Sequence, residues 1–263
     1  MKKSWLVLGS VVAAFGLFVG VQAGRMARRR HAAARPAVAR DSNATVQITT
    51  QEGDLVRVRQ SALPPPPPRD YAAIEQLITD GRTFTYMDEI LGARTGHVAR
   101  WVDRRNDPIK VWVQSKARVK DFWPDYPALA RDAFYTWSNA GIPVKFLFVD
   151  DSTGAEARLH WVDRFPDTAA GKTYWARDLN WWILGGDIEI ALHSSTGAVY
   201  DRDAVHAIAL HEVGHLIGLD HSSDQENIMA PRVHTLRLSP TDLRTAHLIY
   251  QLPPGSVRDA TKP

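Results

Sequence analysis

Three histidines and one glutamate lie close together in the chain, with a spacing that suits a metal site. The stretch from His211 to His221 reads HEVGHLIGLDH. Residues four apart share one face of a helix, so the imidazoles of His211 and His215 can hold two corners of a tetrahedral zinc. Glu212 lies beside the first ligand, where it could take a proton from a water without binding the metal itself.

The third ligand requires the helix to end at the right place. Gly218 can adopt a left-handed conformation, which ends a helix and turns the chain sharply. Such a turn brings His221 back as a third nitrogen ligand, and three neutral imidazoles leave a fourth position open, as a catalytic zinc requires. The alternative is a surface helix with incidental histidines, which explains the first pair at best but not Gly218 and His221.

The elements that would position these side chains can be read from the apolar pattern. Asp201 or Asp203 is the expected N-cap of the zinc helix. Alternating apolar residues predict strands at 109–114, 144–148, 157–162 and 188–192. Apolar residues spaced for one helix face predict a helix over 125–140, and strands around a helix indicate an α/β or α+β sheet with that helix packed on it.

Composition limits both the chemistry and the partners. The chain has 263 residues, with 32 Lys and Arg against 29 Asp and Glu, and no cysteine. The absence of cysteine excludes disulfides, thiolate metal ligands and a cysteine nucleophile, so any metal must be held by histidine and carboxylate. The first 40 residues hold eight basic residues and no acidic one. The remainder is mildly acidic, so the basic charge does not indicate a nucleic-acid partner.

The N-terminal segment predicts export. Two lysines precede an uncharged, mostly apolar run over 5–23, about long enough to cross a bilayer. The run ends Val-Gln-Ala, which fits the small-x-small rule for signal-peptide cleavage. Residues 1–23 are therefore a signal peptide or a membrane anchor, and we expect a periplasmic, secreted or outward-anchored protein. Four arginines follow within seven residues, and the positive-inside rule keeps open a cytoplasmic-facing alternative.

The rest of the chain divides by pattern. The composition of residues 24–69 predicts a basic tether and a Pro-rich linker, which includes a five-proline run at 64–68. Alternating apolar residues within 45–58 predict one short hairpin. Residues 70–96 form an N-terminal extension of unknown role that carries a helical pattern. The denser patterning of 97–252 indicates the main domain, followed by a tail over 253–263.

The eleven-residue stretch resembles the metzincin zinc metalloproteases. Met229 lies in the sequence NIMAP shortly after it and resembles the Met-turn of that clan. The His-Ser ending and the Met-x-Pro turn are most similar to matrixins, the matrix-metalloprotease family. The resemblance covers about 97–252 and implies an α+β metzincin fold with a twisted mixed sheet, long helices including the zinc helix, and a C-terminal helix after the Met-turn. Ser239 as N-cap, with Pro240 at N1, supports the start of that last helix.

The resemblance also implies roles for particular residues. His211, His215 and His221 would bind one zinc, Glu212 would act as general base in peptide hydrolysis, and Met229 and Gly218 would support the site. A strand from Asp187 to Leu192 would be the edge strand that binds substrate, and 232–238 would wall the pocket for the residue after the cleaved bond. The substrate-binding residues expected on this basis are Asp187, Ile188, Glu189, Ile190, Pro231 and Val233.

Three departures from the family pattern are informative. The cysteine that plugs the zinc in many animal matrixins is absent, so any latency must arise in another way. The stretch that holds their second, structural zinc has His160 and Asp163, but Tyr174 and Glu189 stand where histidines are expected, so we expect one zinc. Acidic residues around Gly154 could bind calcium, but they lack a full calcium-loop pattern and predict a solvated loop. These residues are Asp150, Asp151 and Glu156.

Two functions from different classes follow from the sequence. The first is an exported zinc endopeptidase, a monomer that acts on proteins or peptides and meets a membrane only if the N-terminal segment is uncleaved. The second is a catalytically silent, membrane-tethered binding module that keeps zinc for stability. Glu212 favours the first, because a purely structural zinc site needs no general base and is usually closed by four ligands.

Overall fold

The computed structural model describes residues 47–50 and 55–259. The expected signal peptide or anchor at 1–23 and the first part of the basic tether lie outside these residues. Within the described part of the chain, no helix is both long and apolar enough to cross a membrane.

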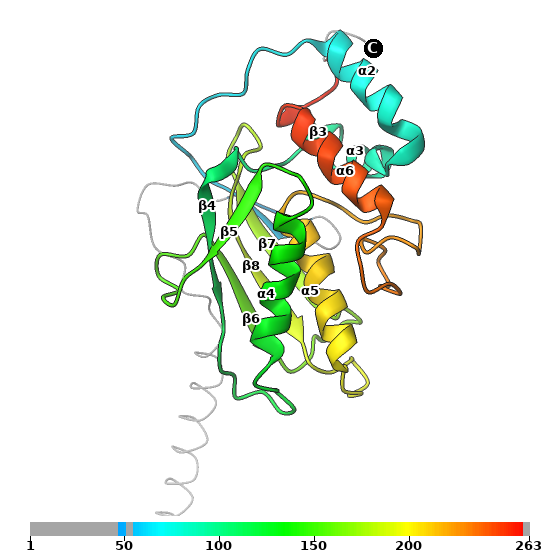
Figure 1. The fold of residues 1–263 in the computed structure, drawn as a ribbon. Coiled ribbons are helices and arrows are strands. Elements are labelled where there is room, and N and C mark those ends of the chain that lie inside the picture. The colour runs from blue at the N-terminus through cyan, green and yellow to red at the C-terminus, as the bar shows by residue number, and fades with distance from the viewer. Residues whose placement is uncertain (1–46, 51–54, 260–263) are drawn as a thin grey trace, which may run out of the picture. The chain divides into compact units, whose positions relative to one another are not determined.

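A mixed sheet forms one layer of the molecule (Figure 1). Its seven strands in the described residues have the order β1-β2-β7-β8-β6-β4-β5. Strands β4, β5, β6 and β8 are parallel to their neighbours in this series, whereas β7 is antiparallel to β8, and β2 is parallel to β7 and antiparallel to β1. The bounds are β1 Gln47–Thr50, β2 Leu55–Val58, β4 Arg104–Val113, β5 Val144–Phe148, β6 Ala157–Val162, β7 Gly171–Arg177 and β8 Ile183–Ala191.

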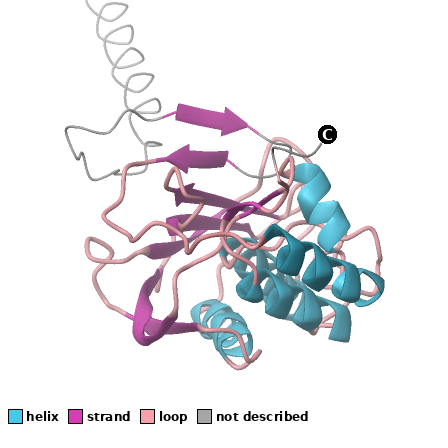
Figure 2. Cartoon of the chain, turned by 90° about the horizontal axis from the view of Figure 1, so that it is seen from above, coloured by secondary structure: helices cyan, strands magenta, loops and turns pink. Residues whose placement is uncertain are grey.

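Two groups of helices complete the fold. Helices α4 and α5 run side by side along one face of the sheet, and α2, α3 and α6 gather at one end of the molecule (Figures 1 and 2). A second, two-stranded sheet joins β3 to β9. The bounds are α2 Tyr71–Gly81, the 3-10 turn η1 Arg82–Phe84, α3 Met87–Ala93, β3 His97–Val98, α4 Tyr126–Ser138, α5 Arg202–Leu216, α6 Pro240–Gln251 and β9 Gly255–Ser256.

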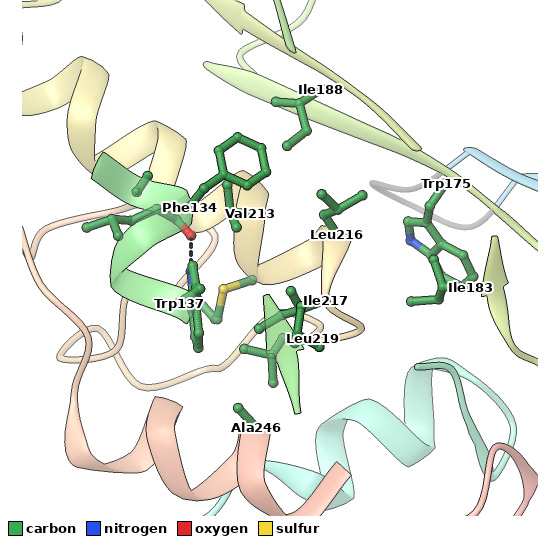
Figure 3. Close-up of a cluster of buried hydrophobic side chains, with 14 of the residues drawn as sticks. Phe134, Trp137, Trp175, Ile183, Ile188, Val213, Leu216, Ile217, Leu219 and Ala246 are labelled. Carbon is green, nitrogen blue, oxygen red and sulfur yellow. Dashed lines mark hydrogen bonds between the residues drawn. The ribbon is translucent and has the colours of Figure 1, made fainter. Parts of the chain in front are cut away.

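The core between α4, α5 and the sheet fixes the position of α5. Phe134 of α4 lies beside Val213 of α5, and Phe134, Trp137, Val213 and Leu216 are all fully buried (Figure 3). The indole nitrogen of Trp137 also donates to the backbone oxygen of Leu210, 2.9 Å away. Burying each large apolar side chain contributes about 1.5–3 kcal/mol, so this cluster strongly opposes sliding or rotation of α5.

The structure confirms most of the predicted elements. The expected strands correspond to β4, β5, β6 and β8, the expected helix over 125–140 is α4, and the hairpin within 45–58 is the β1–β2 pair. The sequence patterns did not predict β7, because Lys172 and Tyr174 interrupt its apolar residues with side chains that could equally belong to a loop. The expected C-terminal helix begins at Pro240 with a capping box formed by Ser239 and Asp242.

One strand was placed wrongly from the sequence. The segment from Asp187 to Leu192 was expected to form the edge strand, but β8 is bonded on both sides, to β6 and to β7. Strand β7 lies outside it. Beyond the expected domain end at 252, β9 pairs with β3 and Val257 is buried, so part of the expected tail belongs to the same body. The domain boundaries themselves stay predictions.

Candidate metal centre

Helix α5 carries the first two histidines and Glu212 on its buried side. Of the two expected caps, the structure uses Asp201, whose carboxylate accepts from the backbone N–H of Ala204 at 2.8 Å. The last six residues of the helix are buried almost completely. Because α5 is held by the core on one side, its opposite side is fixed as the wall of a site.

The imidazoles are oriented by backbone oxygens. Nδ1 of His211 lies 2.8 Å from the oxygen of Ile228, and Nδ1 of His215 lies 3.2 Å from the oxygen of Leu219. A carbonyl oxygen can only accept, so both Nδ1 atoms carry the proton and both Nε2 atoms present lone pairs. These two Nε2 atoms are 3.0 Å apart, and the nitrogen ligand atoms of His211, His215 and His221 all lie within 4.8 Å of one another. Lone pairs that converge so closely need a cation between them.

The protonation of the buried pair suits a metal. Burial lowers the pKa of His215 to about 3, and the neighbouring His221 adds to the effect. Burial, together with His215, also lowers the pKa of His211 well below its usual value. Both rings are therefore neutral at physiological pH, and a metal would not have to displace a proton from either of them.

The turn that brings in His221 depends on Gly218. Its φ is 103°, and a Cβ atom there would lie 2.2 Å from the backbone oxygen of Ala99. Both the left-handed conformation and this close approach exclude any other residue without distortion. The expectation that Gly218 ends the helix and supports the site therefore has two separate physical causes.

Side chains from three distant elements satisfy the carbonyl groups at the end of α5. The Trp101 indole donates to Leu216 at 2.8 Å, and the Tyr250 hydroxyl donates to Ile217 at 2.9 Å. Arg94 donates to the oxygens of Gly218 and Leu219 at 2.7 and 3.0 Å. The last carbonyls of a helix have no partner within it, so these contacts hold the turn in one conformation.

Arg94 also reaches the residue next to the third ligand. Its Nε lies 3.2 Å from Oδ2 of Asp220, and Oδ1 of Asp220 accepts from the backbone N–H of His221 at 2.8 Å. Burial alone would raise the pKa of Asp220, but the Arg94 guanidinium and the His221 N–H hold it below its usual value. A charged pair, with Arg94 only 2% exposed, thus fixes the backbone that carries His221.

Glu212 is held against β7. The Thr173 hydroxyl lies 2.6 Å from Oε2 of Glu212, and both residues are buried. A Cβ atom at Gly171 would lie 2.3 Å from Oε1 of Glu212, so the carboxylate packs where a side chain is missing. One carboxylate oxygen therefore accepts from Thr173, and the other lies beside the backbone of Gly171.

Met229 packs beneath the histidines. A Cβ atom at Gly214, between the two helical ligands, would lie 2.3 Å from the sulfur of Met229. The loop that carries Met229 is tied to α6 by Asp242, which is fully buried and accepts from the Ile228 N–H at 2.9 Å. Met229 therefore supports the site by packing, and the oxygen of Ile228 that orients His211 belongs to the same braced loop.

A cavity of about 820 Å³ opens beside the three histidines and Glu212. The first turns of α5, the start of β7 and residues 231–236 line it, so the expected residues Pro231 and Val233 lie on its wall. The expected residues of β8 do not line this cavity, because β7 separates that strand from it. They are Asp187, Ile188, Glu189 and Ile190.

The other candidate ligands do not converge. Glu156 binds the Arg104 guanidinium through both carboxylate oxygens at 2.8 Å, and within the described residues it forms no metal-binding cluster with Asp150 and Asp151. Tyr174 lies 3.4 Å from Glu189 and Asp163 pairs with Arg164, while His160 packs near Trp112. Within the described residues, the three histidines form the one cluster with metal-ligand geometry.

Several residues of the site escaped the sequence reasoning. Gly171 and Thr173 belong to the unpredicted β7, and Arg94 and Trp101 act across more than a hundred residues of chain. Gly214 lies inside the histidine stretch, and a glycine between two ligands in a helix could have indicated that another residue packs closely against it. The long-range contacts leave no local pattern.

Comparison with known proteins places these features in a family. The sequence profile of the family described as Matrixin matches residues 114–251, just over half of the chain. Metalloendoproteinase 2-MMP of Arabidopsis thaliana is 33% identical over 148 residues, covering 52% of this chain and 38% of its own length. Metalloendoproteinase 1 of Glycine max is 33% identical over 78 residues, covering 28% of this chain and 24% of its own. The chain thus spans well under half the length of these relatives.

Replacing Arg94 by methionine is expected to lower the free energy of unfolding by about 3 kcal/mol, because it removes the buried charge that pairs with Asp220 and one donor to each of two carbonyls. Arg94→Lys should recover only part of this, since the compact ammonium lacks the planar fork whose three nitrogens reach these separate acceptors. Urea unfolding in chelator measures the effect. Arg82→Ala is the control, because Arg82 pairs with Asp88 at an exposed position and should contribute little. Equal effects of the two substitutions would contradict this role of Arg94.

Metal-free protein is expected to lose stability as the pH falls below 6.5. His215 stays neutral in the folded state down to about pH 3, whereas in the unfolded chain it takes up a proton near 6.5. Each such histidine lowers the free energy of unfolding by up to about 1.4 kcal/mol per pH unit below 6.5. Urea unfolding in chelator between pH 7 and 5 measures this slope. It should be shallower in His215→Gln, and an unchanged slope would refute the assignment.

Proposed function

The chain belongs to the matrixin family, and on this premise we propose that it is a zinc-dependent endopeptidase. The observation that carries the proposal is the arrangement of the site: three imidazole nitrogens converge beside the braced carboxylate of Glu212, at the wall of a cavity large enough for a side chain. The relatives from Arabidopsis thaliana and Glycine max that match the chain carry the name metalloendoproteinase.

The donor set supports zinc. Three histidine nitrogens are a common ligand set for catalytic zinc, which keeps a fourth position open. When bound, zinc would polarise a carbonyl oxygen and lower the pKa of a water. His211 and His215 would hold it with their protons on Nδ1, and His221 would complete the set from the Arg94-braced turn.

Glu212 has the position of a general base and acid. Its Oε2 is held by Thr173, so the carboxylate cannot rotate freely, and Oε1 lies against Gly171 at the start of β7. A carboxylate placed there can take a proton from the attacking water and deliver it to the leaving amine. The Thr173 contact fixes the direction of that transfer.

The outer edge of β7 and the cavity would hold the substrate. An extended peptide can add to an exposed strand through main-chain hydrogen bonds, with side-chain specificity coming from adjacent pockets. Gly171 and Lys172 lie both on this edge and on the cavity wall. The cavity between the first turns of α5 and residues 231–236 would take the side chain that follows the scissile bond.

The alternative of a silent zinc module explains less of the site. Zinc that serves only stability is usually bound by four protein ligands in a closed site, and it needs no neighbouring carboxylate. Here Glu212 is buried beside the triad and fixed by a hydroxyl, and a cavity opens at the same point. Burying a carboxylate costs free energy, which favours a role for it in the reaction.

Glu212→Gln is expected to reduce kcat on casein by a factor of about 10²–10⁴ while leaving the zinc content unchanged, because the amide keeps the shape but cannot take the proton. Chelation should abolish cleavage in the wild type, and added zinc should restore it. Glu189→Gln is a matched control at a carboxylate outside the cavity. Wild-type protein that binds one zinc yet cleaves neither casein nor a diverse peptide library would refute the endopeptidase and favour the silent module.

We further propose that the protein is exported, on the basis of the lysines and apolar run at residues 2–23. N-terminal sequencing of the cell-associated and released protein separates the possibilities. Cleavage after Ala23 is the expected result. An intact N-terminus in the membrane fraction would indicate an anchor, and intact protein with its body shielded from external protease would contradict export.

A further inference from the structure

The outer edge of β7 is divided between two environments. Strand β2 pairs with its second half, from Leu55 opposite Tyr174 to Val58 opposite Arg177. Among the described residues, the first half, from Gly171 to Thr173, has no strand partner on this edge and lies beside Glu212. A strand has one row of hydrogen-bonding groups on each edge, so β2 and a bound peptide cannot share the second half.

The segment that contains β2 is fastened to the main body. The Arg59 N–H donates to the backbone oxygen of Arg177 at 2.9 Å, and the Ser61 hydroxyl donates to buried Asp178 at 2.6 Å. Further along, the oxygen of Pro64 accepts from the indole of Trp182 at 3.0 Å. Val56 is itself buried in the core. Strand β2 is therefore a fixed part of the sheet, anchored through the segment that follows it.

We propose that β2 closes one end of the substrate groove and limits how many residues before the scissile bond can bind to β7. The inference rests on the proposed endopeptidase function. At about 3.3 Å per residue, only two or three residues fit along the edge between Glu212 and the backbone of Leu55. A longer peptide must leave the edge there or displace β2.

The direction follows from the course of β7. This strand runs from Gly171, beside Glu212, toward Arg177, where β2 covers it. Antiparallel addition is the more stable pairing, and it places the N-terminal side of a peptide at the covered end. The C-terminal side then extends past the cavity, where β2 does not reach. The restriction therefore falls on residues that precede the cleaved bond.

The first test uses the unaltered protein and peptides of graded length around one cleavage site. Extending the C-terminal side should raise kcat/KM, because each new hydrogen bond contributes about 0.5–1.5 kcal/mol, or roughly two- to twelvefold. Extending the N-terminal side beyond about three residues should change kcat/KM by less than about twofold. A steady gain on both sides would overturn the proposal.

The second test opens the end of the groove. The double variant Arg57→Pro/Arg59→Pro removes two backbone N–H groups from this segment. The N–H of Arg59 donates to β7, and the N–H of Arg57 points to the same side, because the direction of the N–H groups alternates along a strand. Arg57→Ala/Arg59→Ala removes the same charges and keeps both N–H groups. The proline variant should gain about fivefold or more in kcat/KM from N-terminal extension, and the alanine variant should behave as the wild type.

Binding measurements separate this inference from the proposed function. The zinc-loaded Glu212→Gln protein can be titrated with the same peptides by calorimetry, which needs no cleavage. The Kd should fall as the C-terminal side of the peptide is lengthened and stay constant as the N-terminal side is lengthened. Only in the variant that also carries the two proline substitutions should the Kd depend on N-terminal length. Binding that follows this pattern without wild-type cleavage would refute the endopeptidase function but support the proposal that β2 closes one end of the groove. A Kd that does not depend on peptide length on either side would overturn the proposal that β2 closes the groove, whether or not the enzyme is active.

Discussion

The site depends on bringing uncharged imidazole lone pairs together inside a folded protein. Two Nε2 atoms 3.0 Å apart repel each other unless a cation lies between them. Their direction is set by the carbonyl oxygens of Ile228 and Leu219, which accept from the opposite ring nitrogens. Those oxygens must stay in place, so the Met229 loop and the turn at Gly218 are part of the metal site although neither supplies a ligand atom.

Because the backbone around the metal ligands must stay in place, residues that precede the region matched by the family profile also contribute to the site. Helix α5 ends at the ligand turn, and its last carbonyls need donors. Trp101 and Arg94 supply them from the N-terminal side, and Tyr250 supplies one from α6. The extension at 70–96 had no assignable role in the sequence, yet its last part holds the backbone of the third ligand. The family profile starts at residue 114 and does not include these two donors.

The difference between what could and could not be predicted follows the range of the interactions. The two helical ligands, Glu212 and the glycine turn are local, since helix geometry relates residues four apart and glycine marks a left-handed turn. The edge strand is different, because whether β7 or β8 lies outside depends on pairing across the sheet. Alternation in β8 showed that one face is buried, but both a central and an edge strand can have one buried face. Arg94 gave no signal at all, because its partners lie about 125 residues away.

An exposed strand edge is both useful and hazardous, and β7 combines the two in one element. An edge that binds a substrate strand can also bind another chain, so proteins cover or shorten the edges they do not use. Here β2 covers the half of β7 that is distant from Glu212, and within the described residues the half beside Glu212 has no strand partner on that edge. The cover comes from the same chain and is anchored through Ser61 and Pro64. In the proposed groove, the pairing of β2 with β7 therefore sets where a bound peptide must leave β7. A change in this N-terminal segment is then expected to alter the preferred peptide length without touching the metal ligands.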